Sequence, residues 1–233
     1  MNSSFLLLLF FPLQAFGEHL LKRSEDEPRR GPVLPFYASI FIDDAWFCSG
    51  IFISDKLVLT TAHCVDGGSY FDISLGGEPD GQLFSSTDAV IHPNYDPETF
   101  SSDLAVIRLS EAAQVDPATL PAPGEVLQVG DLVCMDNLDQ TFVCAPVMTN
   151  EDCNAVFGNV PEDIVCLDQS TGQLCGVSRT SGAPGVLGED GGPWTLVGVM
   201  EFGSSAGCAA GLPVALARME YHIDWINGLS VAQ

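Results

Sequence analysis

The chain has 233 residues, of which 46% are apolar, enough for one substantial domain or two small lobes that share a core. Its formal net charge is −23, and residues 31–233 carry only four of its eight basic residues. So acidic a body repels nucleic acid and anionic membranes, and we expect neither as a partner. A solubilising surface explains the acidity, which by itself identifies no binding partner.

The N-terminal segment predicts export. The apolar run "FLLLLFFPLQAFG" is too short to span a bilayer as a helix, and Ala15-Phe16-Gly17 makes a small-residue cleavage site. We therefore predict a signal peptide over residues 1–17 and a secreted, extracellular protein. Residues 18–36 carry two dibasic steps, Lys22-Arg23 and Arg29-Arg30, and are predicted to form a propeptide-like arm.

Residues 37–233 are predicted to form one domain in which short apolar runs are bounded by turn residues such as Asp66-Gly67-Gly68. Short strands at this spacing favour an all-β sandwich or a pair of barrels. One helix is predicted near the end of the chain, in "MEYHIDWINGL" over residues 219–229, whose apolar residues can share a broad face. The predicted strands are 37–42, 46–53, 56–62, 71–75, 88–91, 104–109, 131–135, 194–202 and 213–219.

Two polar residues stand at the ends of predicted strands. His63, in "LTTAHCVDG", follows an apolar strand, and Asp103, in "SSDLAVIRLS", precedes another. Singly, a histidine at a strand end is more often structural, and an aspartate before a strand is usually a turn former. Followed by a serine, however, the order His, Asp, Ser is that of an acyl-transfer triad, in which histidine takes the serine proton and a buried carboxylate orients the imidazole.

Several separate segments resemble known proteins. "TTAHC", "SSDLAVIRL" and "YHIDWIN" resemble the chymotrypsin-like serine peptidases, while "FIDDAWFCSG", "PVMTNEDCNAVFG" and "FGSSAGCAAGLPVA" are similar to the arthropod brachyurin branch, the crab-collagenase relatives. The resemblance runs from about Tyr37 to Asn227. It implies an all-β fold of two six-stranded antiparallel β-barrels with the active site between them and a C-terminal helix. It also implies hydrolysis of a protein or peptide substrate, and we expect a monomer.

Eight cysteines in a secreted chain of this size point to disulfides, and no Cys or His cluster has zinc-site spacing, so we expect no metal and no cofactor. Cys134 and Cys144 could close a hairpin of their own. The resemblance implies three other bridges, namely Cys48–Cys64, Cys153–Cys166 and Cys175–Cys208.

The segment "RTSGAPGVLGEDGGPW" holds two places for the nucleophile. Ser181 would give a complete triad, whereas Asp190 in the serine position would give an inactive one. In the resembled family, the nucleophile loop leads into a strand, a turn and a returning strand. Only Gly191–Pro193 separate Asp190 from the returning strand, too few for a strand of about five residues and a turn. We therefore predict Ser181 as the nucleophile, with His63 as the base and Asp103 as its orienting partner.

The loop around Ser181 departs from the family pattern. Arg179 stands where the backbone N–H would complete the oxyanion hole together with that of Ser181. A side chain there either disturbs the loop conformation that glycine accepts or keeps the N–H in place and crowds the cleft. Thr180 stands where an aspartate would pair with a new N-terminal ammonium, and the chain contains no I-V-G-G start sequence. The loop between Cys134 and Pro146 is also shortened and lacks G-W-G, which puts one pocket wall and a structural strand in question.

By resemblance, the primary substrate pocket is formed by Gln173, Gly203 and Val214. None of the three is acidic, which predicts that the pocket prefers an apolar or neutral substrate residue. Glu201 occupies the place of a small serine that faces the triad aspartate, where a second carboxylate would raise a coupled pKa. The remaining histidines, His19, His92 and His222, are expected to be structural.

Three hypotheses follow. The chain is a secreted serine endopeptidase whose triad works, if weakly, without the usual activation. Alternatively, it is a non-catalytic homologue that binds or regulates, as Arg179, Thr180 and the shortened loop suggest. The third hypothesis is a sequence from misjoined exons, which recovery of G-W-G and I-V-G-G in the transcript would establish.

Overall fold

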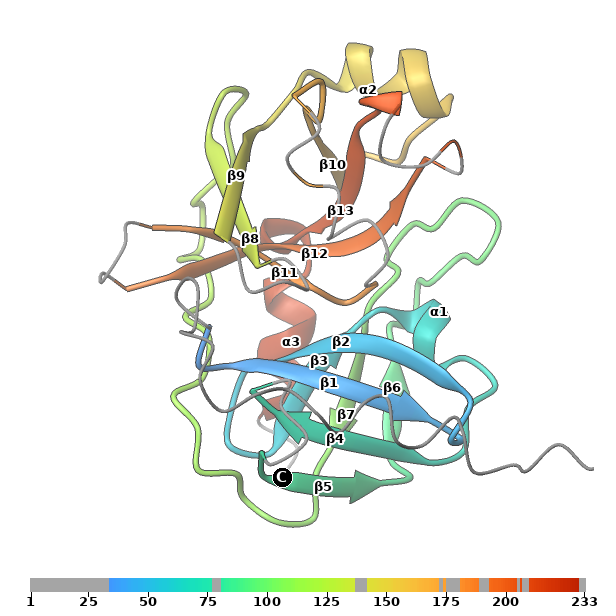
Figure 1. Ribbon diagram of the computed structural model, residues 1–233, viewed down its shortest axis with the longest axis vertical. Coiled ribbons are helices and arrows are strands. Elements are labelled where there is room, and N and C mark those ends of the chain that lie inside the picture. Colours follow the sequence, from blue (N-terminus) through green and yellow to red (C-terminus); the bar gives the residue numbers. More distant parts are fainter. Residues whose placement is uncertain are drawn as a thin grey trace, which may run out of the picture. The chain divides into compact units, whose positions relative to one another are not determined.

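The computed structural model places most of the chain downstream of residue 33 (Figure 1). The predicted signal peptide and most of the arm lie outside the described residues, as do Gln173, Arg179 and Thr180. The described residues are 34–76, 81–136, 142–171, 174, 181–188, 193–204, 206 and 210–230.

The first sheet is antiparallel and has seven strands in the order β5-β4-β1-β2-β3-β7-β6. Its end strands, β5 and β6, follow each other in the chain. Strand β3, which lies inside the sheet between β2 and β7, is buried along its whole length, as expected for the run "LVLT". The strands are β1 (Tyr37–Ile42), β2 (Trp46–Phe52), β3 (Leu57–Thr60), β4 (Phe71–Leu75), β5 (Leu83–Ser86), β6 (Ala89–Ile91) and β7 (Ala105–Arg108).

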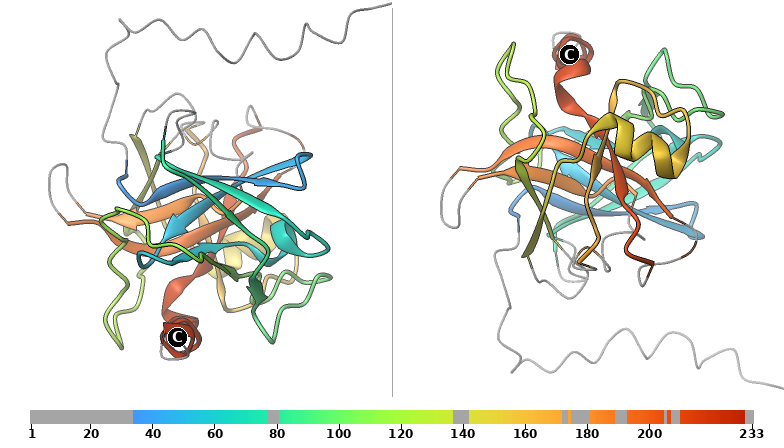
Figure 2. Two further views of the ribbon diagram at one scale, coloured as in Figure 1. Left: turned by 90° about the horizontal axis from the view of Figure 1, so that it is seen from below. Right: turned by 90° about the horizontal axis from the view of Figure 1, so that it is seen from above.

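The second sheet is also antiparallel and has six strands in the order β10-β13-β12-β11-β8-β9. A bridge between Val147, just beyond β9, and Leu167 of β10 brings its two end strands together. The sheet therefore curls toward a closed barrel (Figure 2). Its strands are β8 (Leu132–Asp136), β9 (Phe142–Pro146), β10 (Ile164–Leu167), β11 (Pro184–Leu187), β12 (Thr195–Gly203) and β13 (Val214–Arg218).

Helices are few in the described part of the chain, and none there is long and apolar enough to cross a membrane. Helix α1 (Ala62–Val65) is a single turn directly after β3, and α2 (Asn150–Phe157) precedes β10. The predicted terminal helix is a 3-10 turn, η3 (Met219–Tyr221), followed by α3 (Ile223–Ser230). Thr149 caps α2 by accepting a hydrogen bond from the Asp152 N–H.

The two sheets share one buried core. Its largest cluster joins residues of the first sheet, such as Ile40 and Leu59, to Val186 and Val199 of the second sheet and to Ile226 of α3. Leu34 and Phe36, which precede β1, are also buried in this cluster. The shared core holds the facing loops of the two sheets in fixed positions.

The predicted fold class, two antiparallel β-barrels with a C-terminal helix, is confirmed, and every predicted strand is present with ends within two residues. The first sheet has seven strands rather than six, because Thr87-Asp88 separates β5 from β6. Strands β5, β9 and β10 and helix α2 were not predicted. Strands β8 and β9 both form despite the shortened loop between Cys134 and Pro146.

Candidate active site

His63 and Asp103 lie together at the ends of β3 and β7. His63 is the second residue of α1, and Asp103 follows Ser102, whose φ of 52° turns the chain sharply before β7. The Asp103 side chain is fully buried, whereas that of His63 is 28% exposed. One carboxylate oxygen accepts the His63 backbone N–H at 2.8 Å and the other contacts Nδ1 at 2.5 Å. These two contacts fix the ring and leave Nε2 for reactants.

The loop that carries Asp103 is bound to the second sheet. The Ser102 N–H donates to the carboxylate of Asp163 at 2.7 Å, and the hydroxyls of Ser101 and Ser102 donate to the same carboxylate at 3.2 Å and 3.1 Å. Asp163 lies directly before β10 and is buried. Asp103 is therefore positioned by contacts from both sheets, and Asp163 is a supporting residue that the sequence patterns did not identify.

Ser181 is attached to the first sheet through its backbone. Its carbonyl oxygen accepts the Ser49 N–H at 2.8 Å, and the next N–H, that of Gly182, donates to the Met200 carbonyl at 2.7 Å. Gly182 has φ +88°, and a Cβ there would collide with the carbonyl oxygen of Ser49. Glycine is thus required directly after Ser181.

A disulfide brings this anchor close to the histidine. Cys48, next to Ser49, is bonded to Cys64, next to His63. The Thr60 hydroxyl further fixes the segment by donating to the Ser49 carbonyl at 2.8 Å. The structure therefore gathers the loops of His63, Asp103 and Ser181 at the junction of the two sheets.

The Ser181 side chain makes no hydrogen bond to His63 in the described part of the chain. Its hydroxyl instead donates to the backbone carbonyl of Glu201 at 3.1 Å. Glu201 lies in β12 at an irregularity in the pairing with β13. The hydroxyl of Ser181, the predicted nucleophile, is therefore turned toward β12.

Glu201 itself is unusual, because its side chain is only 2% exposed and neither carboxyl oxygen has a hydrogen-bond partner within the described structure. Burial raises the pKa of Glu201 well above its usual value, and the nearby carboxylates of Asp103 and Asp163 raise it further. The direction agrees with that predicted for a second carboxylate at this place.

The hairpin after Ser181 favours Ser181 over Asp190. Strand β11 begins at Pro184 and pairs antiparallel with β12, with Leu187 opposite Thr195. This is the strand and returning strand expected after a nucleophile at Ser181. Asp190 lies outside the described residues, in the segment between the two strands.

The predicted substrate-pocket residues are only partly described. Gly203 and Val214 are paired across β12 and β13, so the structure brings these two together. Val214 is almost fully buried in the core of the second sheet. Because Gln173 lies outside the described residues, the pocket remains a prediction.

A row of aromatic rings extends from His63. The Phe100 ring lies 5.9 Å from the imidazole, the Phe202 ring 5.5 Å from Phe100, and the Phe157 ring 5.3 Å from Phe202, as distances between ring centroids. The three phenylalanines come from the loop before Asp103, from β12 and from α2. Residues so far apart in sequence form no recognisable pattern, so they were not predicted.

The described disulfides match the predictions. Cys48–Cys64 and Cys153–Cys166 are formed as the resemblance implied. Cys134 and Cys144, left open above, are also bonded and lie directly opposite each other in the β8–β9 hairpin. The predicted Cys175–Cys208 bridge lies outside the described residues.

His92 and His222 are buried, and their rings pack with centroids 5.2 Å apart. Burial lowers the pKa of His92 and lowers that of His222 to about 4. Both imidazoles are therefore neutral at physiological pH and support the core, as predicted.

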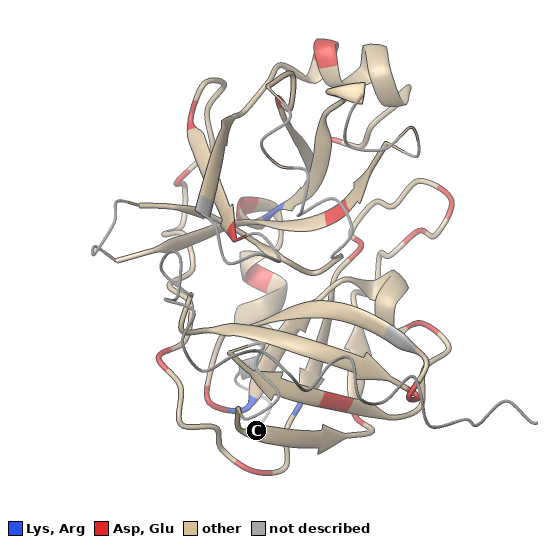
Figure 3. Ribbon diagram, viewed as in Figure 1, with Lys and Arg blue, Asp and Glu red and all other residues tan. Residues whose placement is uncertain are grey.

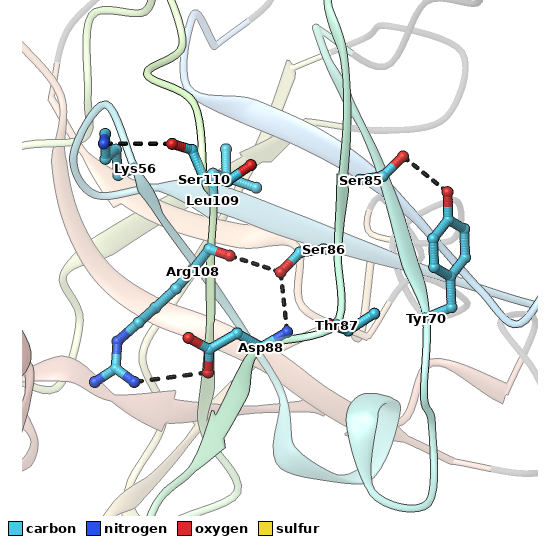
Figure 4. Close-up of a pocket in the computed structure, with 9 residues that line it drawn as sticks. All are labelled: Lys56, Tyr70, Ser85, Ser86, Thr87, Asp88, Arg108, Leu109 and Ser110. Carbon is cyan, nitrogen blue, oxygen red and sulfur yellow. Dashed lines mark hydrogen bonds and ion pairs between the residues drawn. The ribbon is translucent and has the colours of Figure 1, made fainter.

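A cavity of about 530 Å³ lies on the first sheet and includes none of the triad residues (Figure 4). It is lined by Lys56 and Arg108, two basic side chains in a molecule whose acidic residues lie on both sheets (Figure 3). Asp88 already lies 3.7 Å from the Arg108 guanidinium, and Lys56 donates to the Ser110 carbonyl at 3.4 Å. The charges are thus partly compensated, and we assign no ligand to this cavity.

Comparisons with known proteins agree with this geometry. A family model described as trypsin matches residues 23–226. Brachyurin from Leptuca pugilator is 37% identical over 83% of this chain and 92% of its own length, and a collagenase from Hypoderma lineatum is 26% identical over 78% and 75%. The solved structure of HL collagenase superposes with a TM-score of 0.74 at 27% identity, covering 84% of this chain and 94% of that one. The chain therefore belongs to the trypsin family, the chymotrypsin-like serine proteases.

Proposed function

We propose that this protein is a secreted serine endopeptidase that hydrolyses peptide bonds through Ser181, His63 and Asp103. The observation that supports it most is the fully buried Asp103 carboxylate, which holds both the backbone and Nδ1 of His63. Burying this carboxylate costs desolvation energy, and its two contacts orient the imidazole for proton transfer. Export agrees with the disulfides of the described domain.

In this proposal, a rotation about the Cα–Cβ bond of Ser181 moves its hydroxyl from the Glu201 carbonyl to Nε2 of His63. The oxygen then attacks the substrate carbonyl carbon, and its proton passes to Nε2. The imidazolium gives that proton to the leaving amine, and water repeats the sequence to release the acid. The backbone N–H groups of Arg179 and Ser181 would stabilise the oxyanion.

A second candidate function is a non-catalytic binding or regulatory module with the same fold. The hydrogen bond from the Ser181 hydroxyl to the Glu201 carbonyl favours it, because the nucleophile is held away from its base. Thr180 favours it too, since a threonine cannot pair with an N-terminal ammonium as the family's aspartate does.

Cleavage of unfolded protein substrates separates the two. The purified secreted protein is incubated with a reduced, alkylated protein, and new N-termini are identified by mass spectrometry. The proposal predicts cleavage that is abolished in both Ser181→Ala and His63→Ala, preferentially after apolar or neutral residues. Cleavage that persists in Ser181→Ala would indicate a contaminating protease, and its absence in a folded wild-type protein would favour the binding module.

A further inference from the structure

Glu201 occupies a break in the β12–β13 ladder. Met200 pairs with Leu216 and Phe202 pairs with Ala215, so Glu201 is an extra residue with no opposite partner. Such bulges re-aim one side chain, and here the carboxyl group enters the interior. Its own backbone carbonyl holds the Ser181 hydroxyl, and the adjacent Phe202 ring packs on Phe100 beside His63. The bulge thus links Glu201 to the nucleophile and to the surroundings of the base.

The described groups that face Glu201 offer no positive charge. Asp103, before β7, and Asp163, before β10, are both buried carboxylates. Tyr95, from the loop after β6, has its pKa raised to about 12 by burial, with Asp103 and Glu201 contributing, so it is a neutral phenol. His222 of the terminal segment lies 3.7 Å from Asp163 and is itself neutral at physiological pH.

An ionised carboxylate is not stable in such surroundings. Burying a charge without a cation or hydrogen-bond donors is so costly that the group takes up a proton instead. Both Glu201 oxygens lack a partner among the described residues, and no described Lys or Arg pairs with them. Protonation removes the charge and adds one O–H donor.

We propose that Glu201 is a positioning residue that must stay protonated for the active site to remain assembled, and that its ionisation disables the site. The inference rests on the proposed function. Loss of the proton to solvent leaves three buried carboxylates together, namely Asp103, Asp163 and Glu201. Their repulsion drives Glu201 outward and displaces the bulge that holds Ser181. The enzyme would therefore lose activity as Glu201 ionises.

The test compares wild type with Glu201→Gln, which keeps the shape and cannot ionise, and with Glu111→Gln on the exposed surface as a matched control. The rate of fluorophosphonate labelling is measured from about pH 7 to about pH 10. For each protein, the labelling rate at the high pH is divided by the rate at the low pH. We expect this ratio to be at least about tenfold smaller in wild type and in Glu111→Gln than in Glu201→Gln. Equal ratios in all three proteins would overturn the inference.

A second measurement does not depend on catalysis. In Ser181→Ala with ¹³C-labelled glutamate, the Glu201 carboxyl signal is identified by its absence from the double variant with Glu201→Gln. We expect this carboxyl to titrate well above ordinary glutamates, which titrate at about 4.3. Titration at the ordinary value would overturn the inference.

Should Glu201→Gln fail to fold, Glu201→Ser takes its place in both measurements. Absent labelling of wild type at every pH would instead count against the proposed function, and the carboxyl titration would still decide the protonation of Glu201.

Discussion

The two sides of the active site differ in how well their polar groups are satisfied. On the His63 side, the buried Asp103 carboxylate makes two short contacts to one residue, and its loop is held by three hydrogen bonds to Asp163. On the Ser181 side, the backbone is anchored firmly, but the hydroxyl points to a carbonyl and the adjacent Glu201 carboxyl has no described partner. In the proposed function, His63 and Asp103 are thus already in place, whereas the Ser181 hydroxyl must still turn from the Glu201 carbonyl toward His63.

The substitution with the largest expected effect tests the His63 side of the active site, where the polar groups have hydrogen-bond partners. Asp103→Asn replaces the buried carboxylate with an amide of the same shape, which no longer holds His63 in the reactive tautomer. We expect the rate of peptide hydrolysis to fall by about 10⁴-fold, as for other triads. Steady-state kinetics on a peptide substrate would measure it. A loss of less than about tenfold would mean that the Asp103 carboxylate does not orient His63 for catalysis.

Gly182→Ala tests the anchor of the nucleophile. An alanine Cβ would collide with the Ser49 carbonyl at φ +88°, and we expect a loss of about 2–4 kcal/mol in the free energy of unfolding. Gly124 is a matched control, because its φ is +86° but a Cβ there would have nothing within 4 Å. Gly124→Ala should cost only about 1 kcal/mol. Equal losses in urea denaturation would show that the Ser49 contact does not constrain the loop.

Removal of the Cys134–Cys144 bridge tests the hairpin that replaces the longer loop of the family. The bridge closes a short loop, with a sequence separation of 10. Replacing both cysteines with serine should lower the free energy of unfolding by roughly 2–3 kcal/mol, chiefly by freeing the unfolded chain. Chemical denaturation measures this loss, and no change would indicate that the hairpin is rigid without the bridge.

The last expected effect concerns buried His222. Its pKa is lowered to about 4 in the folded protein, while an unfolded histidine titrates near 6.5. The unfolded state therefore binds more protons between these values, so the contribution of His222 to stability is present above about pH 6.5 and is lost as the pH falls toward 4. His222→Phe, which cannot titrate, should lose less stability than wild type between about pH 7 and 4.5. An equal loss in both proteins would show that His222 is not the group responsible.

Much of the fold could be predicted because it depends on local patterns. Strands β1 and β4 match their predicted ranges residue for residue, since each is an apolar run between clear turns. Helix α2 was missed because its buried contribution is concentrated at Cys153, which leaves no apolar periodicity to detect. The site was predicted as far as His63, Asp103 and Ser181. The bond from Ser49 to Ser181 and the partnerless state of Glu201 depend on contacts between distant strands, which a single sequence does not reveal.

The most direct test of the account is covalent labelling of the purified secreted protein with a fluorophosphonate probe, read by the mass of the labelled peptide. The proposed triad predicts about one label per chain on Ser181 and no label in Ser181→Ala, because an oriented His63 activates the Ser181 hydroxyl. A wild-type protein that is folded and disulfide-bonded but takes up no label would contradict the proposal and leave the non-catalytic module as its function.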